Sequence, residues 1–282
     1  MQILRSTFLK LSLVGLVTGL MACGGATSEQ PASPAQAASS PTQVAAAQSP
    51  PADAPSRPAK VSGHPEWSPI MYRSGDAIDG AGPALVRMIF DDLGLAAEFP
   101  FAGTWDEVQA KARSGDVDLL VAAYKTTERE QYMSYSDAYT TDPVALFVKA
   151  GSEFDFANWD ALIGKKGVGT VGDSYGQAFD DFIKEKLDVT IAQSSSEAFD
   201  MVAAGKADYF IYSLFAGERE IAAQNRTGQT VSLPQFVTEE SFYITISKLS
   251  EYGKYLPEIN RLIANYVDDG TVARLIDEYR NR

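Results

Sequence analysis

The sequence predicts an α/β protein whose strands are mostly parallel and are divided between two similar lobes. Helical and strand patterns alternate over residues 61–282, an order typical of parallel sheets that are covered by helices. In addition, a pattern of helix, glycine stop, x-x-Asp and apolar strand occurs twice, at 105–121 and at 196–211. This repeat predicts one sheet for each lobe. A single continuous, doubly wound sheet is the alternative.

Apolar periodicity and glycine stops locate the individual elements. In the first half of the region they predict helices at 82–93 and 105–114, a buried strand at 118–123, a helix that begins at Thr126 or Thr127, and a strand at 145–148. In the second half they predict strands at 166–171, 208–212 and 242–246, and helices at 177–185, 195–204, near 257–267 and at 271–279.

The chain's only cysteine, Cys23, follows the features of a secretory signal at residues 1–22. Arg5 and Lys10 precede an apolar stretch of about ten residues, which is too short to span a bilayer of ~30 Å. The ending Leu20-Met-Ala-Cys23 resembles a bacterial lipobox, and this resemblance implies cleavage before Cys23 and lipidation of its thiol. We therefore expect a protein of the periplasm or cell envelope that is anchored to a membrane by lipid. An ordinary signal peptide that contains a cysteine is the alternative.

Residues 23–60 have the composition of a disordered linker. They are almost wholly Ala, Pro, Ser, Gln and Thr, they hold seven of the chain's 14 prolines, and they include no aromatic residue. Such a segment buries too little apolar surface to offset the entropy of ordering. We therefore expect a tether between the lipid and a folded module at 61–282.

Composition also excludes several classes of function. The chain has 37 acidic and 24 basic residues, a net charge of −13, and no Lys/Arg cluster of the kind that binds nucleic acid. One histidine and one cysteine cannot form the usual His/Cys zinc site, so we expect no metal. The sequence has no Gly-x-Ser-x-Gly elbow and no glycine-rich phosphate loop, and we expect no cofactor. These observations favour a binding protein over an enzyme.

Short motifs in a fixed order resemble the family 3 solute-binding proteins, the periplasmic receptors of polar amino-acid ABC transporters. The motifs are Ser114-Gly-Asp-Val-Asp118, Thr126-Thr-Glu-Arg129, Tyr135-Ser-Asp-Ala-Tyr139, Gly167-Val-Gly169, Gly205-Lys-Ala-Asp208 and Asp269-Gly-Thr271. Each motif is weak alone, but the ordered set covers nearly all of 61–282. The resemblance implies a two-lobed, periplasmic-binding-protein-like fold of type II with two chain crossings.

The same resemblance implies where the lobes begin and end. The crossings would lie near 147–150 and 236–243. Lobe 1 would then comprise residues 61–148 and 243–282, and lobe 2 residues 149–242. In the family, the two lobes close over a ligand that is held between them.

Arg129 is the first candidate for ligand binding. In the family, the arginine of the Thr-x-x-Arg stretch binds the ligand's carboxylate, and a guanidinium fork matches two carboxylate oxygens. The pattern places Arg129 on the first turn of the helix after the 118–123 strand, and helix N-termini also favour anions. A solvated surface arginine is the alternative.

The resemblance supplies further candidates on both lobes. Ala122 would offer a backbone carbonyl, Tyr124 a hydroxyl, and Trp67 a ring that stacks on the ligand. In lobe 2, Asp173 and Ser174 would present amides and hydroxyls at the start of a helix. Packing would also explain the two aromatic rings, and N-capping would explain Asp173 or Ser174.

Two positions depart from the family's pattern. His64 replaces an acidic residue of the first lobe, and Ser213, next to Tyr212, replaces the aspartate that holds the ligand's ammonium group. We include all three in the expected site. Because burying an ammonium group without an anionic partner is costly, recognition of a zwitterion needs another acid. The candidates for that acid are Glu66, Asp173 and Glu197.

These features predict a lipid-anchored extracytoplasmic receptor without enzymatic activity. It would bind a small carboxylate-bearing solute, an amino acid or a derivative, and present its closed form to the membrane subunits of an ABC-type importer. One alternative is an enzyme that resembles cyclohexadienyl dehydratases and uses a cleft carboxylic acid as general acid. Another is a sensory or assembly protein of the same fold that has no transport ligand.

Overall fold

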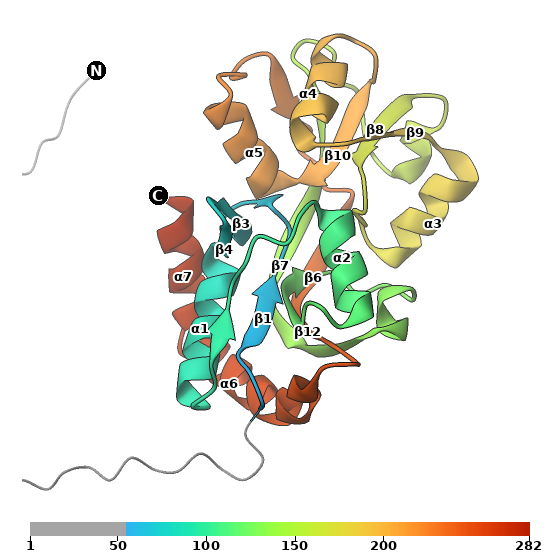
Figure 1. Ribbon diagram of the computed structural model, residues 1–282. Coiled ribbons are helices and arrows are strands. Elements are labelled where there is room, and N and C mark those ends of the chain that lie inside the picture. Colours follow the sequence, from blue (N-terminus) through green and yellow to red (C-terminus); the bar gives the residue numbers. More distant parts are fainter. Residues whose placement is uncertain (1–54) are drawn as a thin grey trace, which may run out of the picture. The chain divides into compact units, whose positions relative to one another are not determined.

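The computed structural model describes residues 55–282 (Figure 1), so the expected signal sequence, Cys23 and most of the expected linker lie outside the described residues. The last part of that linker belongs to the fold. The first strand begins at Ala59, slightly before the expected start of the module. Before this strand, Arg57 donates to Asp118 of the folded core at 2.6 Å. The folded region therefore begins earlier than composition suggests.

Most strands of the described region belong to one sheet of nine strands, in the order β5-β1-β6-β12-β7-β10-β8-β9 with β11 beside β7. The strands of this sheet are β1 (Ala59–Ser62), β5 (Ala97–Glu98), β6 (Leu119–Ala123), β7 (Met133–Lys149), β8 (Lys166–Thr170), β9 (Asp188–Ala192), β10 (Tyr209–Ser213), β11 (Thr230–Ser232) and β12 (Thr238–Ser247). A separate small sheet consists of β2 (Glu66–Trp67), β3 (Met71–Ser74) and β4 (Ala77–Asp79).

The long strands β7 and β12 join two similar lobes. In lobe 1, β1 is parallel to β5 and β6, and β6 pairs antiparallel with the second half of β12. In lobe 2, β8 is parallel to β9 and β10, and β10 pairs antiparallel with the end of β7. The expectation of a separate sheet for each lobe is therefore corrected, because β7 and β12 connect both strand sets in one hydrogen-bonded path.

The first crossing lies earlier than expected. Residues 144–147 of β7 already pair with β10 of lobe 2, whereas residues before them pair with β12. The expected crossing at 147–150 is thus a few residues too late. The apolar run at 145–148 marks the buried strand of lobe 2, and nothing in its composition marks where β7 exchanges partners.

Helices cover the sheet of each lobe (Figure 1). Lobe 1 carries α1 (Ala81–Asp92), α2 (Trp105–Ser114), α6 (Leu256–Asp268) and α7 (Thr271–Arg280), and lobe 2 carries α3 (Gln177–Lys186), α4 (Ser195–Ala203) and α5 (Leu214–Ala223). Three 3-10 helices are η1 (Arg129–Gln131), η2 (Trp159–Leu162) and η3 (Glu251–Tyr255). The helix expected from Thr126 or Thr127 is only the short η1, and α5 was not predicted from the sequence.

The repeated segment has the same structural role in both lobes. The Asp118 carboxylate accepts a hydrogen bond from the backbone N–H of Lys60 at 2.8 Å, and Asp208 accepts one from Lys166 at 2.7 Å. Each aspartate also donates its own backbone N–H to the carbonyl of the same lysine. These paired bonds fix the register of β6 against β1 and of β10 against β8. They thereby position the residues at the carboxyl ends of these strands, where ligands bind in open α/β sheets.

Buried strands lead directly to the boundary between the lobes. All residues of β6 and of β10 are buried, which is typical of strands that are covered on both faces. In lobe 2, the rings of Phe147, Phe199 and Phe210 pack together with centroids 5.0–6.4 Å apart. Because these strands are held rigidly, Tyr124 after β6 and Ser213 at the end of β10 have fixed positions.

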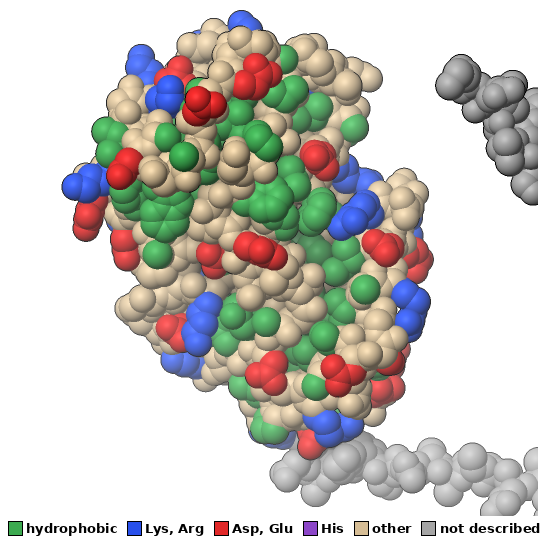
Figure 2. All heavy atoms as spheres, turned by 180° about the vertical axis from the view of Figure 1, so that it is seen from behind, with side chains coloured by type: hydrophobic (Ala, Val, Ile, Leu, Met, Phe, Trp, Pro, Cys, Tyr) green, Lys and Arg blue, Asp and Glu red, His purple; other side chains and the backbone are tan. Residues whose placement is uncertain are grey.

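The outer surface mixes charges of both signs. On the face shown in Figure 2, Lys and Arg side chains alternate with Asp and Glu, and the described residues form no continuous basic patch there. A nucleic-acid interface would need such a patch. Within 55–282, none of the helices has the length and apolar character needed to cross a bilayer.

Candidate functional site

A small pocket between the lobes brings together seven of the nine expected ligand-binding residues. These are His64, Trp67, Ala122, Tyr124, Arg129, Asp173 and Ser174, and the lining is completed by Met71, Trp105, Ala123 and Phe242. The pocket has a volume of about 20 Å³, which is room for about one water molecule. The protein's own side chains therefore fill most of this space.

Arg129 is a buried cation without a carboxylate partner among the described residues. It is only 5% exposed. Its Nε donates to Gln109 at 2.8 Å, its Nη1 to the Tyr124 carbonyl at 3.2 Å and its Nη2 to the Gly172 carbonyl at 3.1 Å. The guanidinium also lies 5.4 Å from the Trp105 ring centroid. A guanidinium has five N–H groups, so two of them remain for another acceptor.

The surroundings of Arg129 differ from the expected helix start. η1 has three residues and no side-chain cap, so it does not provide the anion-binding N-terminus of an α-helix. Instead, the Arg129 backbone N–H donates to Thr126 Oγ1 at 3.2 Å. This bond fixes the turn after β6 and directs the arginine between the lobes. The attraction for an anion comes from the guanidinium rather than from a helix dipole.

Gly172 of lobe 2 approaches lobe 1 closely. Its carbonyl accepts from Gln109 Nε2 at 3.0 Å as well as from Arg129. Its φ is +78°, and a Cβ at this position would lie 3.1 Å from the backbone nitrogen of Asp106. A glycine is therefore needed for the contact between this loop and the start of α2.

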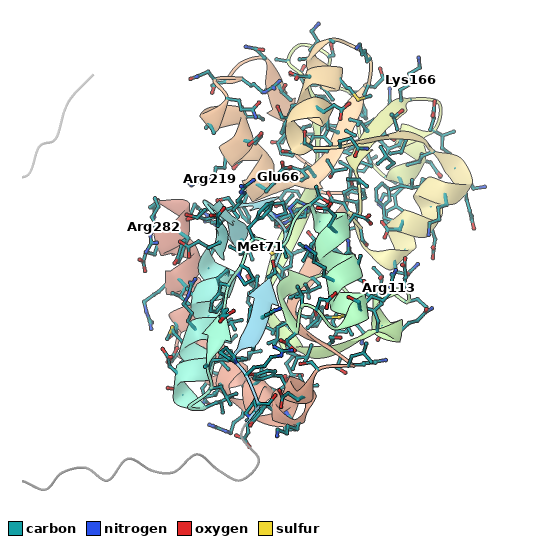
Figure 3. All side chains as sticks on the ribbon, viewed as in Figure 1. Glu66, Met71, Arg113, Lys166, Arg219 and Arg282 are labelled. Atoms are coloured by element: carbon teal, nitrogen blue, oxygen red, sulfur yellow. The ribbon has the colours of Figure 1, made fainter. Side chains whose placement is uncertain are left out.

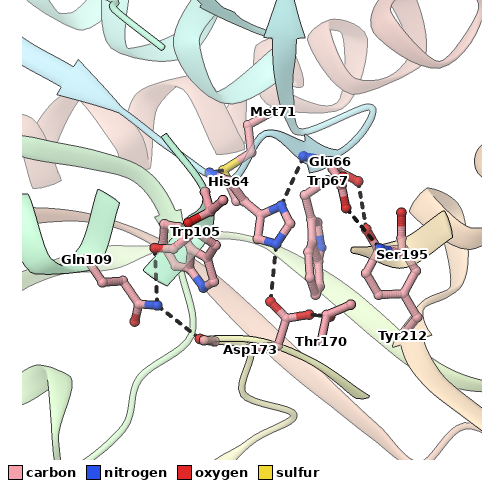
Figure 4. A network of polar contacts seen from close by, with 12 residues as sticks. His64, Glu66, Trp67, Met71, Trp105, Gln109, Thr170, Asp173, Ser195 and Tyr212 are labelled. Atoms are coloured by element: carbon pink, nitrogen blue, oxygen red, sulfur yellow. Dashed lines mark hydrogen bonds and ion pairs between the residues drawn. The ribbon is translucent and has the colours of Figure 1, made fainter. Parts of the chain in front are cut away.

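Polar side chains from the two lobes bond directly to each other in the pocket (Figure 4). His64 Nε2 lies 3.1 Å from Asp173 Oδ1, and Asp173 also accepts from the Thr170 hydroxyl. The other ring nitrogen of His64, Nδ1, accepts from the backbone N–H of Glu66 at 3.0 Å. His64, at the position where the resemblance implies an acidic residue, thus bonds to an acid of the opposite lobe.

Glu66 makes further contacts between the lobes, and Figure 3 shows it at their boundary. Its carbonyl accepts from the Tyr212 hydroxyl at 2.8 Å, and its carboxylate accepts from the backbone N–H of Ser195 at 3.1 Å. Trp67, next in sequence, has its ring centroid 4.9 Å from that of Tyr212 and 4.8 Å from that of His64. Tyr212 therefore contacts Glu66 and Trp67 across the boundary between the lobes and does not line the small pocket.

Ser213 also lies outside the pocket lining, but it leads to an acid that the sequence did not point to. Its hydroxyl donates to Asp142 Oδ1 at 2.8 Å. Asp142 Oδ2 accepts from Trp67 Nε1 at 2.9 Å and from the Tyr124 hydroxyl at 2.5 Å. A buried carboxylate on β7 thus bonds to Ser213, the position where the resemblance implies an aspartate.

Burial dominates the electrostatics of this cluster. It raises the pKa of Asp142 to about 6, although the hydrogen bonds from Tyr124, Trp67 and Ser213 lower it. Burial, followed by the charge of Asp142, raises the pKa of Tyr124 well above its ordinary value. Because no cation among the described residues bonds to Asp142, its negative charge is stabilised by neutral donors alone.

The other acids proposed as ammonium partners or general acids have separate positions. Glu197 is exposed on the first turn of α4 and accepts from the backbone N–H of Gln193 at 2.8 Å. Glu66 bonds to Ser195, as described above. Among the three, only Asp173 lines the pocket. No group of three or more His, Cys, Asp or Glu side chains within 55–282 is placed to hold a metal ion.

A much larger cavity lies between the lobes on the other side of Arg129. Its volume is about 730 Å³, within the range of small-molecule sites. Lobe 1 contributes residues of α2 and of 126–131, and lobe 2 contributes 172–177, α3 and β9. Arg129, Asp173 and Ser174 line both this cavity and the small pocket.

Several residues of the site were missed by the sequence reasoning. Asp142, Gln109 and Phe242 carry no motif of their own, and Trp105 was recognised only as the start of the repeated segment and not as a site residue. The roles of all four depend on how distant segments meet. Gln109 could have been noticed as a polar residue one turn after Trp105 on the predicted helix. For Asp142, the only signal was an acidic residue just before the apolar run at 145–148.

Comparisons with known proteins agree with this architecture. A profile of the "Bacterial extracellular solute-binding proteins, family 3" matches residues 59–282. The L-cystine-binding protein TcyA of Bacillus subtilis is 20% identical over 282 residues, 96% of each chain. The virulence sensor protein BvgS of Bordetella pertussis is 27% identical over 163 residues, which are 54% of this chain and 13% of BvgS. The chain thus spans only a small part of the length of BvgS.

A solved structure shows the same fold. The arginine-, lysine-, histidine-binding protein ArtJ from Geobacillus stearothermophilus superposes with a TM-score of 0.65 at 20% identity, over 80% of this chain and 96% of ArtJ. At this level of identity the likeness concerns the fold alone. It confirms the two-lobed α/β architecture that the sequence predicts.

Proposed function

Because this chain belongs to family 3 of the bacterial extracellular solute-binding proteins, we propose that it is the lipid-anchored receptor of an ABC-type importer. It binds a small carboxylate-bearing solute, an amino acid or a derivative, between its lobes. Residues 1–22 are the signal peptide, Cys23 carries the lipid, and the segment that follows tethers the module to the membrane. The closed form presents its surface to the transporter's membrane subunits.

The observation that carries this proposal is the buried, unpaired charge of Arg129. A buried charge is costly unless an opposite charge lies against it. At present Arg129 bonds only to carbonyl and amide oxygens. A solute carboxylate takes the place of the Gly172 carbonyl and uses the two free N–H groups, so that both charges are paired.

The remaining pocket residues suit an amino-acid-like ligand. Trp67 and Tyr124 supply aromatic surface, and Asp173 supplies a carboxylate for an ammonium group. When the lobes open, His64 releases Asp173 and the small pocket expands. A solute that contacts Arg129 in one lobe and Asp173 in the other then favours the closed state over the open one. TcyA and ArtJ, by their names, bind amino acids, which supports this class of solute.

A thermal-shift screen of amino acids and their derivatives tests the proposal. A solute present at 100 times its Kd should raise the free energy of unfolding by about 2.7 kcal/mol, which is a shift of several degrees in Tm. The same solute at the same concentration should stabilise the Arg129→Gln variant by less than about 1 kcal/mol, because its Kd is expected to rise at least about thirtyfold. A full screen without any shift would count against the receptor function.

A second candidate is a sensory module. It is favoured by the direct bonds between the lobes, His64 to Asp173 and Tyr212 to Glu66, and by the likeness to BvgS, which is named as a virulence sensor protein. In such a module the protein's own contacts keep the lobes closed. The signal would then be a change of this closed state rather than delivery of a solute.

Small-angle scattering separates the two candidates. For a sensory module we expect the purified protein to remain closed without added solute, and the double variant His64→Ala, Tyr212→Phe to show a larger radius of gyration. For an importer receptor we expect the wild type to be open until solute is added. His64→Ala removes one of the bonds between the lobes and Tyr212→Phe removes another. The two single variants show which of these bonds contributes more to the closed state.

A further inference from the structure

The two spaces that meet at Arg129 differ greatly in size. The small pocket holds about 20 Å³ and the larger cavity about 730 Å³. A ligand anchored on the guanidinium can extend into either one. Only the larger cavity offers room for more than a water molecule without rearrangement of Trp67 and Tyr124.

The wall of the larger cavity that lobe 2 contributes has an aliphatic part. Lobe 1 contributes mainly polar and charged groups, among them Gln109 and Thr126. Lobe 2 contributes polar and charged residues of 173–184 and, beside them, three branched aliphatic side chains, Ile183 of α3 and Val189 and Ile191 of β9. Val189 and Ile191 are two residues apart in a strand and therefore point to the same face. Ile191 is 55% exposed, so the strip continues to the cavity's outer edge.

Arg129 is the buried cation of this cavity; Lys184 of α3 also lines it, but its side chain is 74% exposed and its Nζ lies 3.9 Å from Asp181 Oδ1. Arg113 also lines it, but its guanidinium is paired with Glu128 at 2.6 Å. The nearby acid Asp180 accepts from the Ser174 hydroxyl at 2.5 Å and from the Tyr175 backbone N–H at 2.8 Å. Asp180 is thus bound by donors of its own lobe. The positive charge of Arg129 lowers the pKa of Asp180 against the larger raising effect of burial, but no described carboxylate lies within ion-pair distance of Arg129.

We propose that the larger cavity is a binding site for an elongated monocarboxylate with an apolar body. Its carboxylate binds the free N–H groups of Arg129, and its body lies along Ile183, Val189 and Ile191. Medium-chain fatty acids and N-acyl amino acids share this chemistry. The inference rests on the proposed function because both use Arg129 to bind the ligand's carboxylate. It adds a class of solute that is too large for the small pocket.

Calorimetry of the purified full chain with butyrate, hexanoate and octanoate tests the length of the site. Each methylene that the aliphatic strip covers should tighten binding about fourfold, so octanoate should bind at least roughly tenfold tighter than butyrate. The same titration with N-octanoylglycine compares the two ligand classes. Tighter binding of octanoate would identify fatty acids as the ligands, and tighter binding of N-octanoylglycine would identify N-acyl amino acids. Equal affinities along the series, or no binding of either octanoyl ligand, would overturn the proposal.

Ile191→Glu and Ile163→Glu form a matched pair of variants. Both isoleucines lie in lobe 2 and are about equally exposed, at 55% and 52%, but Ile163 does not line the cavity. Octanoate affinity should fall at least roughly tenfold in Ile191→Glu and stay unchanged in Ile163→Glu. Equal effects of the two substitutions would contradict the aliphatic wall.

Amino-acid binding distinguishes this inference from the proposed function. If amino acids bind and Arg129→Gln abolishes their binding, while octanoate never binds, the receptor function stands and the larger site falls. If octanoate binds equally well to the wild type and to Arg129→Gln, the carboxylate anchor is wrong and the inference fails with it. Loss of both ligands in Arg129→Gln, with loss of octanoate alone in Ile191→Glu, supports both proposals.

Discussion

Arg129→Gln should weaken binding of a carboxylate-bearing solute by about 2–5 kcal/mol, because it removes the charge that pairs with the carboxylate in a buried site. At 25 °C this is a loss of about thirtyfold to several-thousandfold in Kd. Glutamine keeps much of the side chain's length and still offers an amide donor to Gly172. The effect therefore reports the charge rather than the loss of packing. Isothermal titration calorimetry with a solute identified by thermal shift measures it.

Two other substitutions make the measurement specific. Arg113→Gln removes an arginine that lines the same cavity but is 53% exposed and paired with Glu128, and it should cost less than about 1 kcal/mol. Arg129→Lys keeps the charge but loses the planar fork, so its affinity should be intermediate. If Arg129→Gln and Arg113→Gln behave alike while both proteins remain folded by circular dichroism, the assignment of Arg129 is wrong.

Local patterns predicted much of the fold, because the elements here are defined by contacts near in sequence. Glycine stops and apolar periodicity placed α2 and α4, and the repeated x-x-Asp motif predicted two similar lobes. The long strands β7 and β12 were not recognised as a shared ladder. Their length results from pairing with β6 and β10, which are distant in sequence, and no local pattern records that pairing.

The residues of the candidate site likewise fall into those that the sequence predicted and those that only the tertiary structure revealed. Arg129 belongs to a recognisable motif and Trp67 was a candidate from the family resemblance, and the structure places both in one pocket. Asp142 became visible only through tertiary contacts, since Trp67, Tyr124 and Ser213 come from three separate segments. The departure at Ser213 indicated that an acid was missing there, and the structure shows the Asp142 carboxylate bonded to that serine. Inspection of position 213 alone could not identify Asp142, because the acid comes from a different segment of the chain.

Asp142→Asn should remove a specific pH dependence of stability. Burial raises the pKa of Asp142 to about 6, from its ordinary value of 3.8. Between these values the folded protein holds a proton that the unfolded chain has released. The contribution of this group to the free energy of unfolding is therefore complete below about pH 4 and is lost as the pH rises through 6.

The expected size follows from the difference of about two pH units between the folded and the unfolded pKa, or about 3 kcal/mol. Asparagine resembles the protonated acid: its oxygen can accept from Trp67 and Tyr124, and its amide can donate to Ser213. We expect similar stabilities of the two proteins at pH 4. At pH 7.5 the Asn variant should be more stable by up to about 3 kcal/mol. Urea denaturation at several pH values measures the difference.

The comparison between the two proteins isolates Asp142, since other buried acids titrate in both. Burial also raises the pKa of Asp180, Glu220 and Glu240, and their contributions cancel in the difference. Asp142→Ala provides the opposite control. It leaves three buried donors without an acceptor and should destabilise the protein by about 3 kcal/mol or more at every pH. If the stability of the Asn variant depends on pH in the same way as that of the wild type, burial does not raise the pKa of Asp142 in the folded protein, and the prediction is wrong.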